Sequence, residues 1–324
     1  MTLPADADIL RGDIRAVARA IRAVEDGWPE SRALLSRLFE HAGRALTIGV
    51  TGPPGAGKST LVDRLTAHFR KTGKTVGVIA VDPTSPFSGG AILGDRIRMQ
   101  DHAMDDGVFI RSMATRGALG GLSAATTAAL LVLDASGKDI LIVETVGVGQ
   151  DEVDIASEVD VAIVVLVPGM GDGVQALKAG IMEIADIFVV NKADRDGADR
   201  LAADIETTLS LTGENQQDRP PVLRTVAQAG EGIDQLVETI EAVRGRREQS
   251  GQFAERRRAR LLRQFEVQVE GLLRERARRL IEALDSTQAL RDRVRSREID
   301  PFAAADRTLQ GLASETIAGP TPAR

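Results

Sequence analysis

The most constraining feature of the chain is a glycine-rich turn between a predicted strand and a predicted helix. Residues 52–60, Gly-Pro-Pro-Gly-Ala-Gly-Lys-Ser-Thr, fit the pattern G-x-x-x-x-G-K-[S/T]. Residues 45–51 form an apolar run, and residues 61–69 have the spacing of an amphipathic helix. In this arrangement, backbone N–H groups and the helix dipole point at a bound anion. The sequence therefore predicts an α/β P-loop fold that binds the phosphates of a nucleotide.

Residues of this turn have separate expected roles. The glycines let the backbone approach the phosphates because they carry no side chain. Lys58 is expected to reach the β- and γ-phosphates, and the Ser59 hydroxyl is expected to bind a magnesium ion. The candidate phosphate-binding residues are Gly52, Pro53, Pro54, Gly55, Ala56, Gly57, Lys58, Ser59 and Thr60.

A second motif predicts which base is bound. Residues 191–194, Asn-Lys-Ala-Asp, follow the predicted buried strand 184–190. The Asp194 carboxylate can accept hydrogen bonds from N1–H and from the exocyclic amine of guanine. Adenine lacks both donors, and a carboxylate left unpaired destabilises the complex by about 1–3 kcal/mol. The motif therefore predicts GTP and GDP as ligands.

Neighbouring groups are expected to complete the base site. The Lys192 stem can lie on the ring face, and Asn191 can tie its own loop to the P-loop. Residues 224–232 form a loop after another short apolar segment. This placement suits a loop that offers a backbone N–H, that of Ala227, to the guanine oxygen.

Three acids are candidates for the metal and the γ-phosphate. Glu144 ends the predicted strand 138–144, where a P-loop protein usually has the Asp that holds magnesium. Because Glu is one methylene longer than Asp, Glu144 could contact the magnesium ion either directly or through a water molecule. Asp82 ends another predicted strand, and Asp95 lies in the following loop, which is typical of a switch that orders around the γ-phosphate. The alternatives are a turn-forming Asp82 and a helix-capping Asp95.

The usual water-positioning side chain is missing. A Ras-like enzyme has Gln directly after the glycine at position 147, whereas this chain has Val148 and places Gln150 two residues further on. We expect slow intrinsic hydrolysis, with other groups or a partner completing the site. The candidate catalytic residues are Lys58, Asp82, Asp95 and Glu144, and the candidate metal ligands are Ser59, Asp82, Asp95 and Glu144.

Composition argues against several other classes of protein. The chain has 324 residues, no cysteine and three widely spaced histidines, so neither a disulfide nor a thiolate metal site is expected. Its apolar runs are shorter than the ~20 residues of a membrane span, and the acidic N-terminus lacks a signal-peptide layout. The net charge of −6 gives no general case for nucleic-acid binding. These features predict a cytoplasmic protein that binds neither membranes nor nucleic acid.

The sequence predicts three parts. Residues 1–45 have apolar side chains at helical spacing on both sides of Trp28-Pro29, and predict two helices of an N-terminal extension. Residues 46–245 alternate predicted strands and helices, which indicates a mostly parallel sheet covered on both faces. Within them, the glycine-rich loop 168–180 is either a mobile partner-sensing switch or a plain surface loop. Residues 246–324 form a C-terminal helical arm.

The arm is predicted to hold two copies of the chain together. Residues 244–297 contain 16 Arg against 8 Asp and Glu, interleaved with an apolar stripe. A helix of ~30 residues is ~45 Å long, and its stripe must be buried. A homodimer buries it most simply. Nucleic-acid binding is the alternative, but the interleaved acids and the lack of stacking aromatics weigh against it. The stripe comprises Leu261, Leu262, Phe265, Val269, Leu272, Leu273, Leu280, Ile281 and Leu284.

Together these motifs resemble the methylmalonyl-CoA mutase-associated GTPases, which are related to the nickel-insertion GTPases. The resemblance covers nearly the whole chain and includes residues 52–60, residues 81–86 and residues 191–194. Its most specific piece is Glu-Thr-Val-Gly-Val-Gly-Gln at residues 144–150, because ordinary GTPases have Asp-x-x-Gly. The lack of cysteine and of a histidine cluster disfavours the nickel branch.

The resemblance implies a homodimeric GTPase that binds a cobalamin-dependent mutase, gates its cofactor loading and protects it from inactivation. A metabolic P-loop enzyme or a transport-associated nucleotidase is the alternative class, although the sequence has no signature of an acceptor pocket. By the match, phosphate and magnesium are bound by Lys58 and Ser59. The acids around the metal and the γ-phosphate are Asp82, Asp95 and Glu144. The guanine base is bound by Asn191, Lys192 and Asp194.

Overall fold

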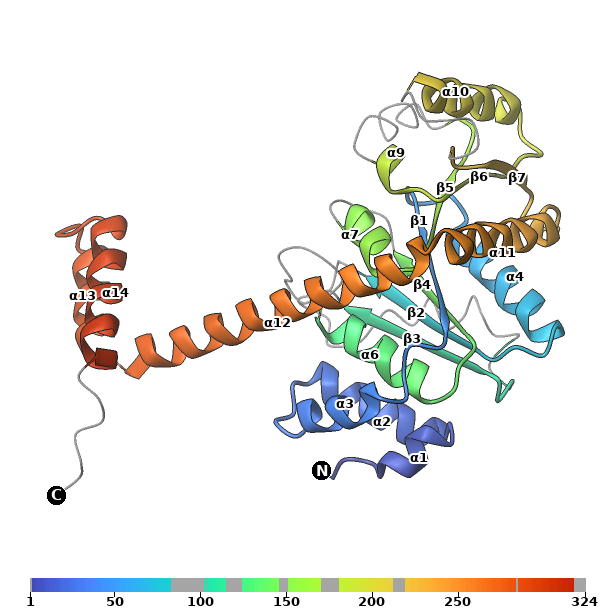
Figure 1. Cartoon of the computed structure of the whole chain (residues 1–324). Coiled ribbons are helices and arrows are strands. Elements are labelled where there is room, and N and C mark those ends of the chain that lie inside the picture. The colour runs from blue at the N-terminus through green and yellow to red at the C-terminus, as the bar shows by residue number, and fades with distance from the viewer. Residues whose placement is uncertain are drawn as a thin grey trace. The chain divides into compact units, whose positions relative to one another are not determined.

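The structure is a computed structural model that describes residues 2–82, 102, 104–114, 124–145, 151–169, 181–211, 219–283 and 285–317. It contains two compact units, Met1–Arg260 and Leu261–Arg324. The first combines a sheet with helices, and the described part of the second is helical (Figure 1).

A seven-stranded sheet forms the centre of the first unit, in the order β3-β2-β4-β1-β5-β6-β7. All the pairings between these strands are parallel, which confirms the predicted α/β fold. The central strands β1, β4 and β5 are buried along their whole length because both faces of the sheet are covered. The strands are β1 (Leu46–Thr51), β2 (Val76–Asp82), β3 (Val108–Ala114), β4 (Ile140–Thr145), β5 (Val161–Leu166), β6 (Ile187–Asn191) and β7 (Val222–Thr225).

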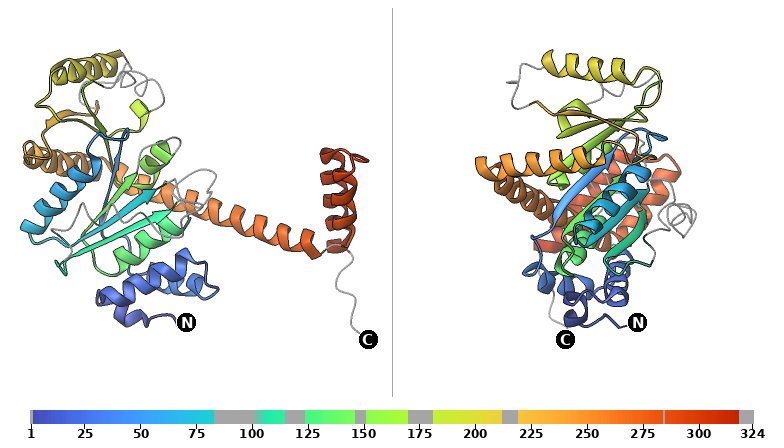
Figure 2. Two further views of the ribbon diagram at one scale, coloured as in Figure 1. Left: turned by 180° about the vertical axis from the view of Figure 1, so that it is seen from behind. Right: turned by 90° about the vertical axis from the view of Figure 1, so that its right-hand side faces the viewer.

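Helices cover the two faces of this sheet, as the views in Figure 2 also show. One face packs on α4 (Lys58–Lys71) and α11 (Ile233–Ser250). The other face is covered by α6 (Ala124–Ala135), α7 (Asp151–Glu158) and α10 (Ala198–Leu211). The short helix α9 (Ile181–Ile184) precedes β6.

The first 45 residues form three helices instead of the predicted two. They are α1 (Asp6–Leu10), α2 (Ile14–Glu25) and α3 (Ser31–Phe39), and all three contact α6. α1 and α2 are separate because Gly12 is left-handed, with a φ of 77°, and Asp13 caps α2 by accepting the N–H of Ala16 at 2.8 Å. The apolar spacing continues across this break, so spacing alone predicts one helix there.

The second unit contains most of α12 (Gln252–Ala283), together with α13 (Asp285–Arg295) and α14 (Pro301–Ile317). α12 has 32 residues, in agreement with the predicted long helix. Most of its large apolar side chains from Leu261 to Leu280 are exposed in the single chain, and Leu262 and Phe265 are each 64% exposed. None of the helices in the described ranges is long and apolar enough to cross a membrane.

An arginine cluster joins the end of α11 and the start of α12 to the sheet within the first unit. Two carboxylates, 3% and 8% exposed, lie immediately before β5 and β6, and each binds two guanidinium groups. Each carboxylate also accepts a backbone N–H, from Thr47 at 2.9 Å and from Ala162 at 2.8 Å. The cluster comprises Asp160, Asp186, Arg247, Arg256, Arg257 and Arg260.

Candidate nucleotide-binding site

The predicted site residues come from the carboxyl ends of several parallel strands. Because all these strands run in one direction, their ends meet at one edge of the sheet. β1 ends at Thr51, β4 at Thr145, β6 at Asn191 and β7 at Thr225. This edge is where open α/β sheets bind their ligands.

The turn after β1 needs glycine at two places. Gly52 has a φ of 138°, and a Cβ there would lie 2.1 Å from the backbone oxygen of Val165 on β5. Gly57 has a φ of 86°, and a Cβ there would lie 2.5 Å from the amide nitrogen of Asn191. The turn is therefore packed against β5 and against Asn191 at the end of β6, and its positive φ angles and close contacts favour glycine at both positions.

The ammonium group of Lys58 is held at the start of α4. Lys58 is 5% exposed, and its Nζ donates to the backbone oxygens of Gly52 at 2.7 Å and Pro53 at 3.0 Å. A buried ammonium beside the free N–H groups of a helix N-terminus makes this turn a strongly anion-binding surface.

Ser59 and Glu144 form the described part of the candidate metal site. The Ser59 hydroxyl donates to Glu144 Oε1 at 2.6 Å, and Glu144 is 5% exposed. A hydroxyl and a carboxylate oxygen in contact suit magnesium, which prefers oxygen ligands. Behind them, the hydroxyl groups of Thr51 and Thr145 lie 2.9 Å apart and join the ends of β1 and β4. Among the described residues, no group of three or more His, Cys, Asp or Glu could hold a metal.

Asn191 connects the P-loop with the loop after β7. Asn191 is 2% exposed, and its Nδ2 donates to the backbone oxygen of Ala56 at 2.8 Å. Its Oδ1 accepts the Thr225 hydroxyl at 3.0 Å and the backbone N–H of Ala227 at 3.1 Å. One buried amide therefore fixes both loops to each other.

The residue after Asn191 also contacts the phosphate-binding turn. Lys192 has a left-handed backbone, with a φ of 56°, and its Nζ donates to the backbone oxygen of Gly55 at 2.8 Å. Asp194 is exposed. The Ala227 N–H, which is expected to bind the guanine oxygen, donates to Asn191 Oδ1 in this structure. Its contact with guanine stays a prediction.

Some predicted site residues or their side chains lie outside the described part of the chain. Asp82 ends β2, but its side chain is outside the described set. Asp95, Val148 and Gln150 lie outside the described residues, as do positions 170–180 of the predicted switch loop. Their roles stay predictions.

The structure also brings in residues that sequence patterns do not identify. Arg64 of α4 donates to the backbone oxygens of Ala227 and Gln228, at 3.2 Å in each case. Thr225 binds Asn191 from the end of β7. These contacts join segments more than 30 positions apart, so no local motif predicts them.

Comparison with known proteins shows similarity along most of the chain. The model of the family described as Methylmalonyl Co-A mutase-associated GTPase MeaB matches residues 17–281. A protein of Pyrococcus abyssi is 50% identical over 305 residues, covering 93% of this chain and 94% of that protein. The Mus musculus protein named Methylmalonic aciduria type A homolog, mitochondrial, is 33% identical over 331 residues, covering 94% of this chain and 78% of that protein.

A solved structure has the same fold. It is described as the crystal structure of LAO/AO transport system kinase, and it superposes with a TM-score of 0.69 at 26% identity. The similarity covers 95% of this chain and 96% of the other.

Proposed function

Because the chain belongs to the family of methylmalonyl-CoA mutase-associated GTPases, we propose that it regulates a cobalamin-dependent mutase. In this proposal the GTPase binds methylmalonyl-CoA mutase or a related mutase, gates cofactor loading and protects the mutase from inactivation. The observation that carries the nucleotide part is the Asn191 side chain, which joins the phosphate-binding turn to the loop after β7. The family description carries the choice of partner.

The predicted site residues have separate proposed tasks in GTP binding. Lys58 places its ammonium on the β- and γ-phosphates, and the turn donates backbone N–H groups to them. Asp194 accepts the N1–H and the amine of guanine. Ser59 and Glu144 would hold magnesium, which supplies positive charge to the phosphate oxygens when bound. Asp82 and Asp95 are proposed to complete the surroundings of the metal and the γ-phosphate.

The functional assignment of the three parts of the chain is also a proposal. Residues 46–245 form the proposed nucleotide domain, residues 1–45 its helical support and residues 246–324 the dimerisation arm. The first compact unit continues to Arg260, because the arginine cluster holds the start of α12 to the sheet.

A purified mutase tests the regulatory role. We expect methylmalonyl-CoA mutase from the same organism to co-elute with the chain in size-exclusion chromatography, with different affinities in GDP and in a non-hydrolysable GTP analogue. Since Val148 replaces the usual glutamine, the mutase should also raise GTP turnover by an order of magnitude or more. Bovine serum albumin at equal concentration serves as the control. An unchanged elution volume and unchanged turnover in both nucleotide states would refute the proposal.

Homodimer formation is tested on the exposed face of α12. Several of its large apolar side chains are exposed in the single chain, and symmetric pairing would bury them. Replacing Phe265, Leu272 and Leu273 together with glutamine should give a monomeric mass by light scattering, with GDP affinity unchanged. Leu211→Gln is the matched control, because Leu211 is 81% exposed outside the arm.

Truncation gives a second test of the same interface. The cut must lie beyond Arg260, because an earlier cut leaves Asp160 without its arginines. Residues 1–263 should remain a GDP-binding monomer. A monomeric full-length chain, or a dimer that survives both changes, would contradict the arm assignment.

A further inference from the structure

Arg64 makes a fork of hydrogen bonds to the loop after β7. It lies on α4, the helix that begins with Lys58 and Ser59. Its Nε donates to the backbone oxygen of Ala227 and its Nη2 to that of Gln228, both at 3.2 Å. Two donors from one planar group on successive carbonyls fix both the position and the direction of this peptide.

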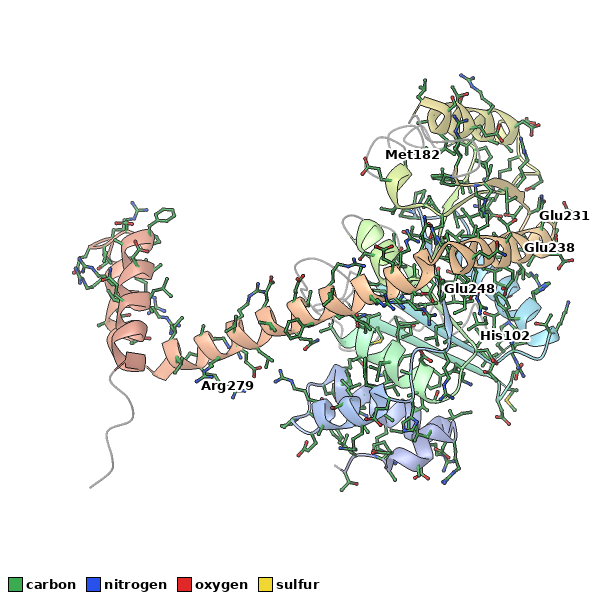
Figure 3. All side chains as sticks on the ribbon, viewed as in Figure 1. His102, Met182, Glu231, Glu238, Glu248 and Arg279 are labelled. Carbon is green, nitrogen blue, oxygen red and sulfur yellow. The ribbon has the colours of Figure 1, made fainter. Side chains whose placement is uncertain are left out.

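These bonds close a ring that includes the phosphate-binding turn. The N–H of Ala227 donates to Asn191, and Asn191 donates to Ala56 of the turn. From the turn, the chain continues directly into α4 and returns to Arg64. We call residues 225–232 the base loop; it closes with a bridge between Val226 and Glu231, and Figure 3 marks Glu231 just before α11. The base loop is thus held from two sides, by Asn191 and by Arg64.

The guanidinium group of Arg64 donates its hydrogen bonds to these backbone carbonyls and not to a carboxylate. Among the described residues, no carboxylate forms a salt bridge with Arg64. Hydrogen bonds from a charged donor are stronger than neutral ones. Their loss would free the Gln228 side of the base loop, while Asn191 would still hold the N–H of Ala227.

We infer that Arg64 is a positioning residue for the base loop and therefore a determinant of guanine specificity. By holding the 227–228 peptide, Arg64 keeps the base loop beside Asn191 and the residues that follow it. The base then meets an ordered loop and does not have to order it on binding. This inference rests on the proposed recognition of guanine by Asp194 and the base loop.

Packing between α4 and α11 does not depend on Arg64. Leu61, Leu65 and Phe69 of α4 lie in one buried apolar cluster with Ile233 and Leu236 of α11. The Arg64 side chain is only half-buried, at the edge of this cluster. Removing its charged end should therefore leave the fold intact and loosen the base loop alone.

His68 supplies a matched control on the same helix face. It lies one turn after Arg64, and its Nδ1 is 2.9 Å from Asp234 Oδ1 in the first turn of α11. This contact joins the same two helices but does not reach the base loop. The Asp234 side chain is 88% exposed, so the contact contributes little to stability.

Calorimetry on the full-length chain, with magnesium in excess, tests the inference. The variant is Arg64→Met, which keeps the apolar stem and removes the donors. The probes are GDP, ADP and inorganic tripolyphosphate, which has no base. GDP affinity should fall about tenfold, the change produced by about 1.4 kcal/mol, while tripolyphosphate affinity stays unchanged. Arg64→Lys should restore part of the GDP affinity, and His68→Ala should leave it unchanged.

The reference variant Asp194→Asn separates the two levels of the hypothesis. If it leaves the preference for GDP over ADP unchanged, the proposed base recognition fails, and the role of Arg64 fails with it. If Asp194→Asn reduces that preference and Arg64→Met does not, only the role of Arg64 is overturned. An equal fall in tripolyphosphate and GDP affinity would also overturn it, because Arg64 would then act through the phosphate-binding turn.

Discussion

Replacing Lys58 with alanine is expected to weaken the binding of a non-hydrolysable GTP analogue about a hundredfold and to abolish measurable GTP hydrolysis. The Lys58 ammonium lies between two backbone oxygens at the mouth of the turn, where the phosphates are proposed to bind. Two charge-assisted hydrogen bonds to phosphate contribute about 3 kcal/mol together, which is about a hundredfold in Kd. Calorimetry and steady-state phosphate release measure the two effects.

Two variants make this result specific. Lys71→Ala removes an exposed charge from the last turn of the same helix, so it should change neither binding nor turnover. Glu144→Ala should lower turnover more than it lowers GDP affinity, because Glu144 is proposed to act at the metal and the γ-phosphate. An unchanged rate in the Glu144 variant would remove it from the mechanism. Retention of tight triphosphate binding by Lys58→Ala would remove the lysine from the phosphate site.

Asp160→Ala is expected to lower the free energy of unfolding by about 3–5 kcal/mol, the range found when one partner of a buried ion pair is removed. The Asp160 side chain is 2% exposed and binds Arg257 at 2.6 Å and Arg260 at 3.3 Å. Its loss leaves two partly buried guanidinium groups and the N–H of Thr47 without this acceptor. Urea denaturation at a fixed protein concentration measures the change.

An exposed pair is the control for the Asp160 variant. Arg224 and Asp199 lie 2.9 Å apart, but the Asp199 side chain is 93% exposed. Asp199→Ala should therefore change stability by less than about 1 kcal/mol. A similarly small loss for Asp160→Ala would show that the buried pair contributes little to the stability of the first unit.

Local patterns account for most of the fold. The parallel sheet follows from apolar runs, each covered on both faces, and the phosphate-binding turn follows from a motif of adjacent residues. Patterns of this kind do not predict β3, an edge strand in which Arg111 and Ser112 interrupt the apolar sequence. Arg111 instead pairs with Glu25 of α2, a contact that depends on the tertiary fold.

Long-range polar contacts are the part that the sequence could not predict. The sequence assigns the arginine excess of residues 244–297 to the dimerisation arm, yet four of these arginines bind buried carboxylates of the first unit. Asp160 and Arg257 lie 97 positions apart, and no local sequence motif around either residue predicts their contact. For the same reason, Arg64 resembles an ordinary helix residue in sequence, and Ala227 shows no sign of its bond to Asn191.

The arginine cluster also sets an order for folding during synthesis. Asp160 and Asp186 are made with β5 and β6, well before the ribosome reaches Arg256 and Arg257. Until those arginines emerge, a closed sheet would bury carboxylates without their full set of partners, which is strongly unfavourable. We therefore expect the nucleotide-binding unit to complete its folding only after residues 256–260 have left the ribosomal exit tunnel.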